Sequence, residues 1–144
     1  MPASVDFYVL AGAEARSHDV FFCRLVHKAW RQGHAVYVHA ADAAHAEAFD
    51  DLLWTYHDIS FVPHARAWQD DPAAAPVCVG YADEHAPHDD LLLNLAGNVP
   101  GCATRFRRIV ESAGFDDATR GAARARYRQY QERGCELKTH QVSV

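Results

Sequence analysis

The chain has 144 residues, 49% of them hydrophobic and 23% charged, which is the composition of one globular domain and not of a disordered or fibrous protein. No apolar run approaches the roughly 20 residues of a membrane-spanning helix, and the first residues lack a basic start followed by an apolar stretch, so we expect one domain over residues 1–144 in a cytoplasmic protein. The formal net charge is −5, but residues 101–144 carry +4 and residues 1–100 carry −9, which disfavours general binding of phosphate backbones and still permits one local cationic face.

The first half of the chain is predicted to alternate strands and helices. Ser17 can cap a helix whose apolar residues recur at helical spacing, and Gly33 can end it. Asp42 can cap a second helix that reaches Trp54. The strands that precede these helices are expected over residues 5–10 and 35–39, where the apolar runs are short and uniform.

The second half is predicted to contain two more helices. Pro100 can open a helix that runs through Val110. Asp116 or Asp117 can cap a last, long helix that ends at Gly134. The remaining strands are expected over residues 76–81, 91–95 and 135–140, and the longest loop over residues 66–75.

This order of elements predicts an α/β fold, a three-layer, Rossmann-like domain in which a mostly parallel sheet is flanked by helices. The turn after the first strand contains one glycine, Gly12, whereas a dinucleotide-binding fingerprint needs three. The Gly-Lys-Ser/Thr sequence of a phosphate-binding loop does not occur in the chain. We therefore expect no nucleotide-binding loop.

Ten histidines raise the question of a metal site, and the densest cluster is formed by His85, His88, Asp89 and Asp90. It lies in a polar turn and lacks the Cys-x-x-Cys or helical His-x-x-x-His spacing of zinc sites. The four cysteines are far apart, which favours free thiols in a reducing compartment. The chain also lacks the Gly-x-Ser-x-Gly motif of serine hydrolases. The sequence therefore predicts no metal, no cofactor and no catalytic residue.

One face of the last predicted helix carries the clearest functional signal. Positions i, i+4, i+7, i+8 and i+11 are Arg120, Arg124, Tyr127, Arg128 and Gln131, which we call the arginine stripe. Like charges at this spacing repel one another unless nearby acidic groups neutralise them. Arginine binds carboxylates in a bidentate manner, and a tyrosine among arginines offers an apolar plate, so the stripe suits an acidic peptide that also contains a hydrophobic residue. The plain alternative is a solvated, arginine-rich helix without a partner.

Short motifs in a fixed order span nearly the whole chain. They are Phe7-Tyr8-Val9-Leu10, Trp30-Arg31-x-Gly33, Leu53-Trp54, Phe61-Val62-Pro63-His64, Pro76-Val77, Leu91-Leu92-Leu93-Asn94-Leu95, and Arg124-x-Arg126-Tyr127-Arg128-x-Tyr130 followed by Gly134, Leu137 and Thr139. No single motif is diagnostic, but their order and spacing resemble those of the chi subunit of the bacterial DNA polymerase III holoenzyme, a clamp-loader accessory.

The resemblance implies a Rossmann-like domain without nucleotide chemistry or intrinsic enzymatic activity. Members of the family bind the acidic C-terminal tail of single-stranded DNA-binding protein and pair with the psi subunit, which implies indirect contact with DNA and no membrane partner. That tail ends in aspartates, a proline and a phenylalanine, which matches the arginine stripe. Carried over by position, the resemblance puts Arg124, Tyr127 and Arg128 on the acidic groups, Arg120 at the edge, and Trp54 and Phe61 in the apolar pocket.

The residues leave other interpretations open. Trp54 and Phe61 are also compatible with ordinary core packing. The last helix is compatible with direct binding of single-stranded DNA or RNA, with Tyr127 and Tyr130 as stacking plates, although the acidic first hundred residues argue against a continuous basic groove. An enzyme that uses the switch point of the sheet, where ligands sit in open α/β folds, is the third possibility.

Overall fold

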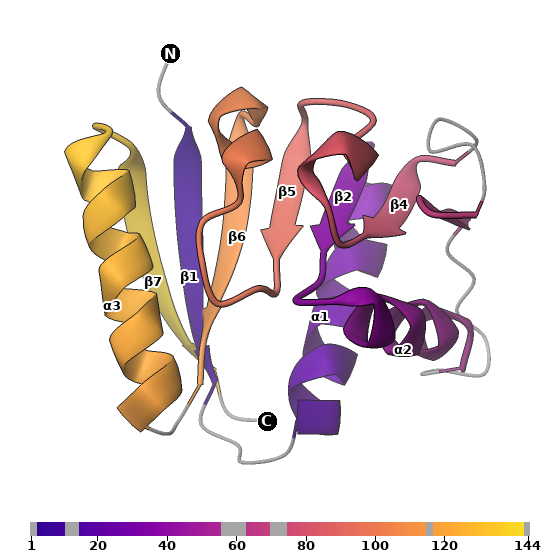
Figure 1. The fold of residues 1–144 in the computed structure, drawn as a ribbon, viewed down its shortest axis with the longest axis horizontal. Helices are drawn as coiled ribbons and strands as arrows, with labels where there is room; N and C mark the ends of the chain where they lie inside the picture. The colour runs from indigo at the N-terminus through magenta and orange to yellow at the C-terminus, as the bar shows by residue number, and fades with distance from the viewer. Residues whose placement is uncertain (1–2, 11–14, 56–62, 70–74, 115–116, 143–144) are drawn as a thin grey trace.

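A single sheet of seven strands, all of them paired in parallel, organises the fold in the order β3-β4-β2-β5-β6-β1-β7 (Figure 1). The computed structural model describes residues 3–10, 15–55, 63–69, 75–114 and 117–142. The strands are β1 (Ser4–Leu10), β2 (Val36–His39), β3 (His64–Arg66), β4 (Val77–Gly80), β5 (Leu91–Asn94), β6 (Arg108–Ala113) and β7 (Glu136–Val142). Within the described ranges, no helix combines the length and the apolar character needed to cross a membrane.

Two hydrophobic clusters cover the two faces of the sheet and make three layers. The helices α1 (Ala15–Arg31) and α2 (Ala43–Thr55) pack on one face. The other face is covered by α3 (Asp117–Glu132) and the short 3-10 helix η3 (Gly101–Arg105), with the 3-10 helix η2 (Asp83–His85) in contact with η3. Figure 1 shows α3 beside β7 and β1 at one end of the sheet and α2 at the other end. The predicted α/β class and three-layer arrangement are confirmed.

The central strands are buried along their whole length. Every residue of β2, β4 and β5 is buried, because consecutive side chains point to opposite faces and both faces are covered. In β2, Val36 and Val38 join the cluster under α1 and α2, whereas Tyr37 joins the cluster on the other face. The uniform apolar runs in the sequence therefore predicted these strands correctly.

In the first half of the chain, most helix ends lie where the sequence predicted them. The side chain of Asp42 caps α2, since its Oδ1 accepts a hydrogen bond of 2.8 Å from the backbone N–H of His45. Gly33 follows α1 with a φ of 91°, a conformation that glycine adopts without strain. The predicted cap at Ser17 is wrong, because α1 begins at Ala15 and Ser17 lies in its first turn.

The helix predicted from Pro100 through Val110 is also wrong. A short 3-10 helix covers Gly101–Arg105, and the chain then enters β6, which pairs with both β5 and β1. Ile109 and Val110 belong to opposite hydrophobic clusters, which is the alternation of a strand and not the one-sided pattern of a helix. Pairing with two neighbouring strands outweighs the weak helical spacing of this segment.

The sequence did not predict β3, a strand of three residues that pairs with β4 at the edge of the sheet. Its last residue, Arg66, was assigned to the loop over residues 66–75, of which residues 70–74 lie outside the described part. The last helix begins at Asp117, with Asp116 outside the described residues, and Gly134 follows its end with a φ of 76°. The predicted terminal strand is confirmed as β7.

Candidate functional site

The packing of α3 leaves the arginine stripe at the surface. The buried residues of the helix are Ala123, Arg126 and Tyr130, a face that lies about a third of a turn from the stripe at 3.6 residues per turn. Arg120, Arg124, Arg128 and Gln131 are exposed. Tyr127 is half-buried at the border of the two faces, with its ring 5.4 Å from the ring of Phe7 in β1.

A groove of about 330 Å³ lies between α3 and the strands β1 and β7, and we call it the α3 groove. Its buried lining residues are apolar, whereas its exposed ones carry charge or polar groups. The lining consists of Phe7, Val9, Ala113, Arg120, Ala123, Arg124, Tyr127, Thr139 and Gln141. The structure thus brings three residues of the stripe next to an apolar hollow, while Arg128 and Gln131 lie beyond the lining.

No carboxylate among the described residues neutralises the guanidinium groups of the stripe. Within the part of the chain that the structure describes, Arg120, Arg124 and Arg128 form no ion pair, whereas Arg66 and Arg126 are paired with Asp50 and Glu111. Three unpaired positive charges along one helix face favour the approach of an acidic partner.

A buried ion pair attaches α3 to the sheet. The Nε of Arg126 donates to Oε1 of Glu111 in β6 at 2.9 Å, and the two side chains are 5% and 0% exposed. The same guanidinium donates to the carbonyl oxygens of Gly97 at 2.9 Å and Ser112 at 2.7 Å. Because all three of its bonds end on β6 or on the loop after β5, Arg126 determines how α3 sits against the sheet.

The carboxylate of Glu111 accepts two further hydrogen bonds. Its Oε2 accepts from the hydroxyl of Tyr130 at 2.6 Å and from Nδ2 of Asn94 at 2.9 Å. Burial raises the pKa of Glu111, and the charge of Arg126 opposes that rise. Burial, and then the neighbouring carboxylate of Glu111, raise the pKa of Tyr130. Sequence reasoning missed this network, although Ala123, Arg126 and Tyr130 stand at the i, i+3, i+7 spacing of a buried helix face.

Trp54 does not line the α3 groove. It lies on α2 with 51% of its surface exposed, and its ring is 4.4 Å from the ring of His64 in β3. The strand on which α2 packs, β4, is five strand spacings from β7, or roughly 24 Å at 4.8 Å each. Neither a pocket shared with the arginines nor ordinary core packing describes Trp54. Phe61 lies outside the described residues.

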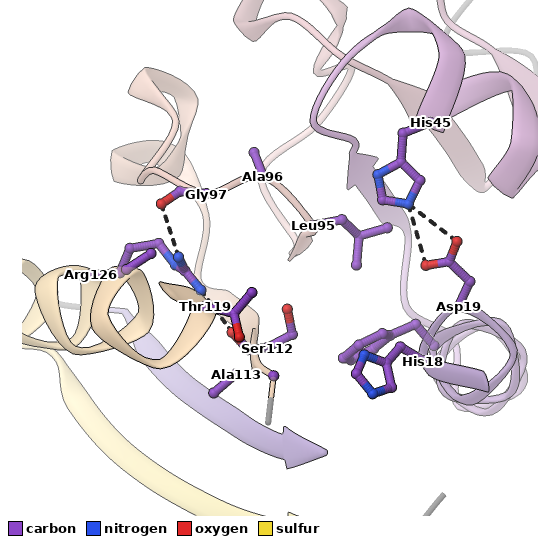
Figure 2. Close-up of a pocket in the computed structure, with 13 residues that line it drawn as sticks. His18, Asp19, His45, Leu95, Ala96, Gly97, Ser112, Ala113, Thr119 and Arg126 are labelled. Carbon is purple, nitrogen blue, oxygen red and sulfur yellow. Dashed lines mark hydrogen bonds and ion pairs between the residues drawn. The ribbon is translucent and has the colours of Figure 1, made fainter. Parts of the chain in front are cut away.

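A second cavity, of about 560 Å³, lies at the carboxyl ends of β5 and β6 and is also lined by residues of α1, α2 and α3 (Figure 2). Its charged groups are already bonded to the protein. Arg126 is held as described above, and Nε2 of His45 lies 3.2 Å from the carboxylate of Asp19, a hydrogen bond that raises the pKa of His45. The α3 groove, with its unpaired arginines, is therefore the better candidate for a binding site.

Comparisons with known proteins identify the family of the chain. The family described as "DNA polymerase III chi subunit, HolC" matches residues 1–138. The DNA polymerase III subunit chi of Pseudomonas aeruginosa is 41% identical over 138 residues, or 96% of each chain. The protein of the same name from Escherichia coli is 30% identical over 118 residues, 81% of this chain and 80% of its own, and that from Haemophilus influenzae is 28% identical over 143 residues, 99% of both. The chain belongs to the chi subunit family of DNA polymerase III.

Proposed function

We propose that the chain is a non-catalytic accessory subunit of the clamp-loader complex that binds the acidic C-terminal tail of single-stranded DNA-binding protein in the α3 groove. Through the psi subunit it would link that protein to the replication machinery. The observation that carries the proposal is a row of exposed arginines, without an ion pair to any described residue, beside an apolar groove.

The chemistry of the groove suits both the acidic groups and the phenylalanine of such a tail. Aspartate side chains and a terminal carboxylate would be bound by the forked donors of Arg120, Arg124 and Arg128. A phenylalanine side chain would lie in the hollow against Phe7 and Tyr127, where aromatic rings pack edge to face or offset. At the far wall, Thr139 and Gln141 of β7 add a hydroxyl and an amide that can donate to carboxylates.

One such contact is expected to be weak on its own. A dissociation constant on the order of 1 µM corresponds to about −8 kcal/mol. Salt should weaken binding, because exposed charges are screened beyond about 8–10 Å at physiological ionic strength. Several tails on one coated DNA strand would raise the effective concentration and hence the overall avidity.

Fluorescence anisotropy with a labelled tail peptide tests the proposal. Arg124→Ala should raise the dissociation constant about 10-fold or more, since a hydrogen bond to a charged group contributes about 1.5–3 kcal/mol. Arg31→Ala is the matched control, because it removes the same charge from an exposed position on α1, across the sheet from α3. Equal affinity of Arg124→Ala and the wild type would remove the stripe from the mechanism.

A second titration separates the tail from nucleic acid. A single-stranded oligonucleotide at low salt should form no complex with the wild-type protein. A complex that Arg124→Ala abolishes, together with no binding of the tail peptide, would favour direct nucleic-acid binding by α3 instead.

A further inference from the structure

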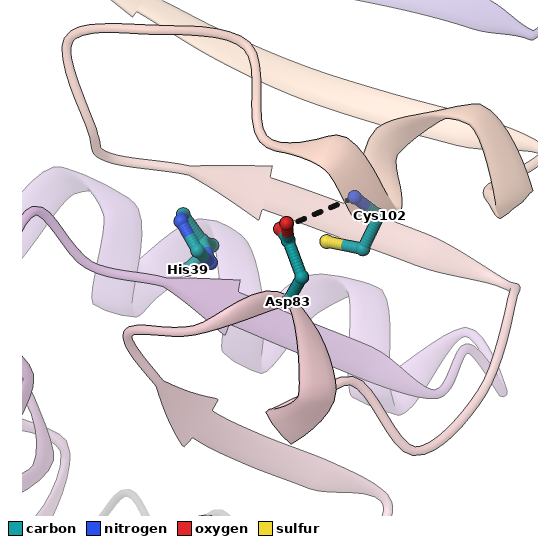
Figure 3. Close-up of side chains that lie close together, drawn as sticks. All are labelled: His39, Asp83 and Cys102. Atoms are coloured by element: carbon teal, nitrogen blue, oxygen red, sulfur yellow. Dashed lines mark hydrogen bonds between the residues drawn. The ribbon is translucent and has the colours of Figure 1, made fainter.

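Three side chains with metal-binding atoms converge on the face of the sheet that η2 and η3 cover. His39 ends β2, Asp83 begins η2 and Cys102 lies in η3 (Figure 3). One nitrogen, oxygen or sulfur atom from each lies within 4.8 Å of the other two. None of the three lines the α3 groove, and their separation along the chain explains why no spacing motif predicted them.

We propose that His39, Asp83 and Cys102 form a binding site for a divalent transition-metal ion, and that zinc is the ion that fits best. Calcium and magnesium take oxygen ligands, whereas a set of one imidazole, one carboxylate and one thiolate suits zinc. Three protein ligands leave the fourth tetrahedral position to water or another small ligand.

The carboxylate of Asp83 is already held against η3. Its Oδ1 accepts a hydrogen bond of 3.2 Å from the backbone N–H of Cys102. A Cβ atom at Gly101 would lie 2.7 Å from its Oδ2, so glycine at this position permits the close approach. Asp83 is exposed while the other two ligands are buried, which gives an ion a path from solvent to the site.

The imidazole of His39 has the outer partner that metal-binding histidines need. The hydroxyl of Tyr37 donates to the carbonyl oxygen of Ala82 at 2.7 Å, so its 3.3 Å contact with His39 is one in which Nδ1 donates to it. This bond fixes the tautomer with the lone pair on Nε2 and orients the ring.

Cys102 is buried in η3 and would bind the ion as its thiolate. Binding of a divalent ion would form the metal–sulfur bond and break the S–H bond, releasing one proton per ion.

Titration of the full-length protein with cobalt(II), followed by absorption spectroscopy, tests the site. We expect one equivalent of cobalt to produce a thiolate-to-cobalt charge-transfer band and the visible bands of a four-coordinate ion, and one equivalent of zinc to remove both. The chain contains nine other histidines, but weak binding to them would give no thiolate band. Cys102→Ser should abolish the band, and Cys135→Ser, at the least buried cysteine, should leave it unchanged.

Asp83→Asn provides a variant that is expected to fold, because Asp83 is exposed and an amide oxygen can still accept from the Cys102 N–H. It should weaken zinc binding by at least about 10-fold, because even the loss of a residue that only hydrogen-bonds to a metal ligand costs about 10-fold or more in affinity. Competition with a chromogenic chelator measures this affinity. A wild-type protein without the thiolate band would overturn the proposal. So would a band that Cys135→Ser removes, or one that Asp83→Asn leaves at full affinity.

Discussion

The buried pair of Arg126 and Glu111 makes the stability of this protein depend on one side chain of α3. Arg126→Ala removes three hydrogen bonds and leaves the carboxylate of Glu111, which is 0% exposed, without its countercharge. Removing one partner of a buried ion pair costs about 3–5 kcal/mol. Since the pair is 5% and 0% exposed, solvent screening does not reduce this figure.

Urea unfolding followed by circular dichroism measures the effect. With a slope of about 2 kcal/mol per M, a loss of 3–5 kcal/mol lowers the midpoint by about 2 M. Arg124→Ala is the control, because Arg124 is exposed two residues earlier on the same helix and should change stability by less than about 0.5 kcal/mol. We therefore expect Arg126→Ala to lower the stability of the protein, and Arg124→Ala to weaken tail binding while stability stays nearly unchanged.

The loss should also depend on pH. Burial already raises the pKa of Glu111, and without Arg126 that pKa rises further. The native variant then holds a proton that the unfolded chain, with a glutamate pKa of about 4.3, has released, so stability falls as pH rises between these two pKa values. Arg126→Ala should therefore cost more at pH 7 than at pH 5. A cost below about 1 kcal/mol at pH 7 would refute the assigned role of the pair.

Other consequences can be tested by unfolding experiments. The hydrogen bond that Nε2 of His45 donates to Asp19 raises the pKa of His45. The stabilisation from this bond is fully present below the unfolded pKa of about 6.5 and is lost as pH rises through the raised value. His45→Gln should flatten this part of the profile of stability against pH, and an unchanged profile would contradict the assignment. Gly33→Ala should lower stability by about 1–2 kcal/mol because of its φ of 91°. Gly121→Ala, in α3 with open space at its Cβ, should raise stability by about 0.5–1 kcal/mol, and thermal unfolding of both variants checks the opposite signs.

The sheet shows where pattern reading succeeds and where it fails. The strands β2, β4 and β5 were predicted because their runs of apolar residues are buried on both faces. The strand β6 was taken for a helix because Pro100 can open one that runs through Phe106, Ile109 and Val110. The same strand contains the carboxylate of Glu111. That carboxylate can be buried because Arg126, Asn94 and Tyr130 donate hydrogen bonds to it. A local sequence pattern does not predict hydrogen-bond partners that are distant in the chain.

The same division applies to the candidate site. Helical periodicity is local, so the sequence by itself determined that Arg120, Arg124 and Arg128 share one face of a helix. Only the tertiary structure decided that this face borders a groove, since Phe7 and Thr139 reach it through the pairing of β1 with β7. The order of the strands likewise separated Trp54 from the arginines, because which strands become neighbours depends on packing between segments distant in sequence.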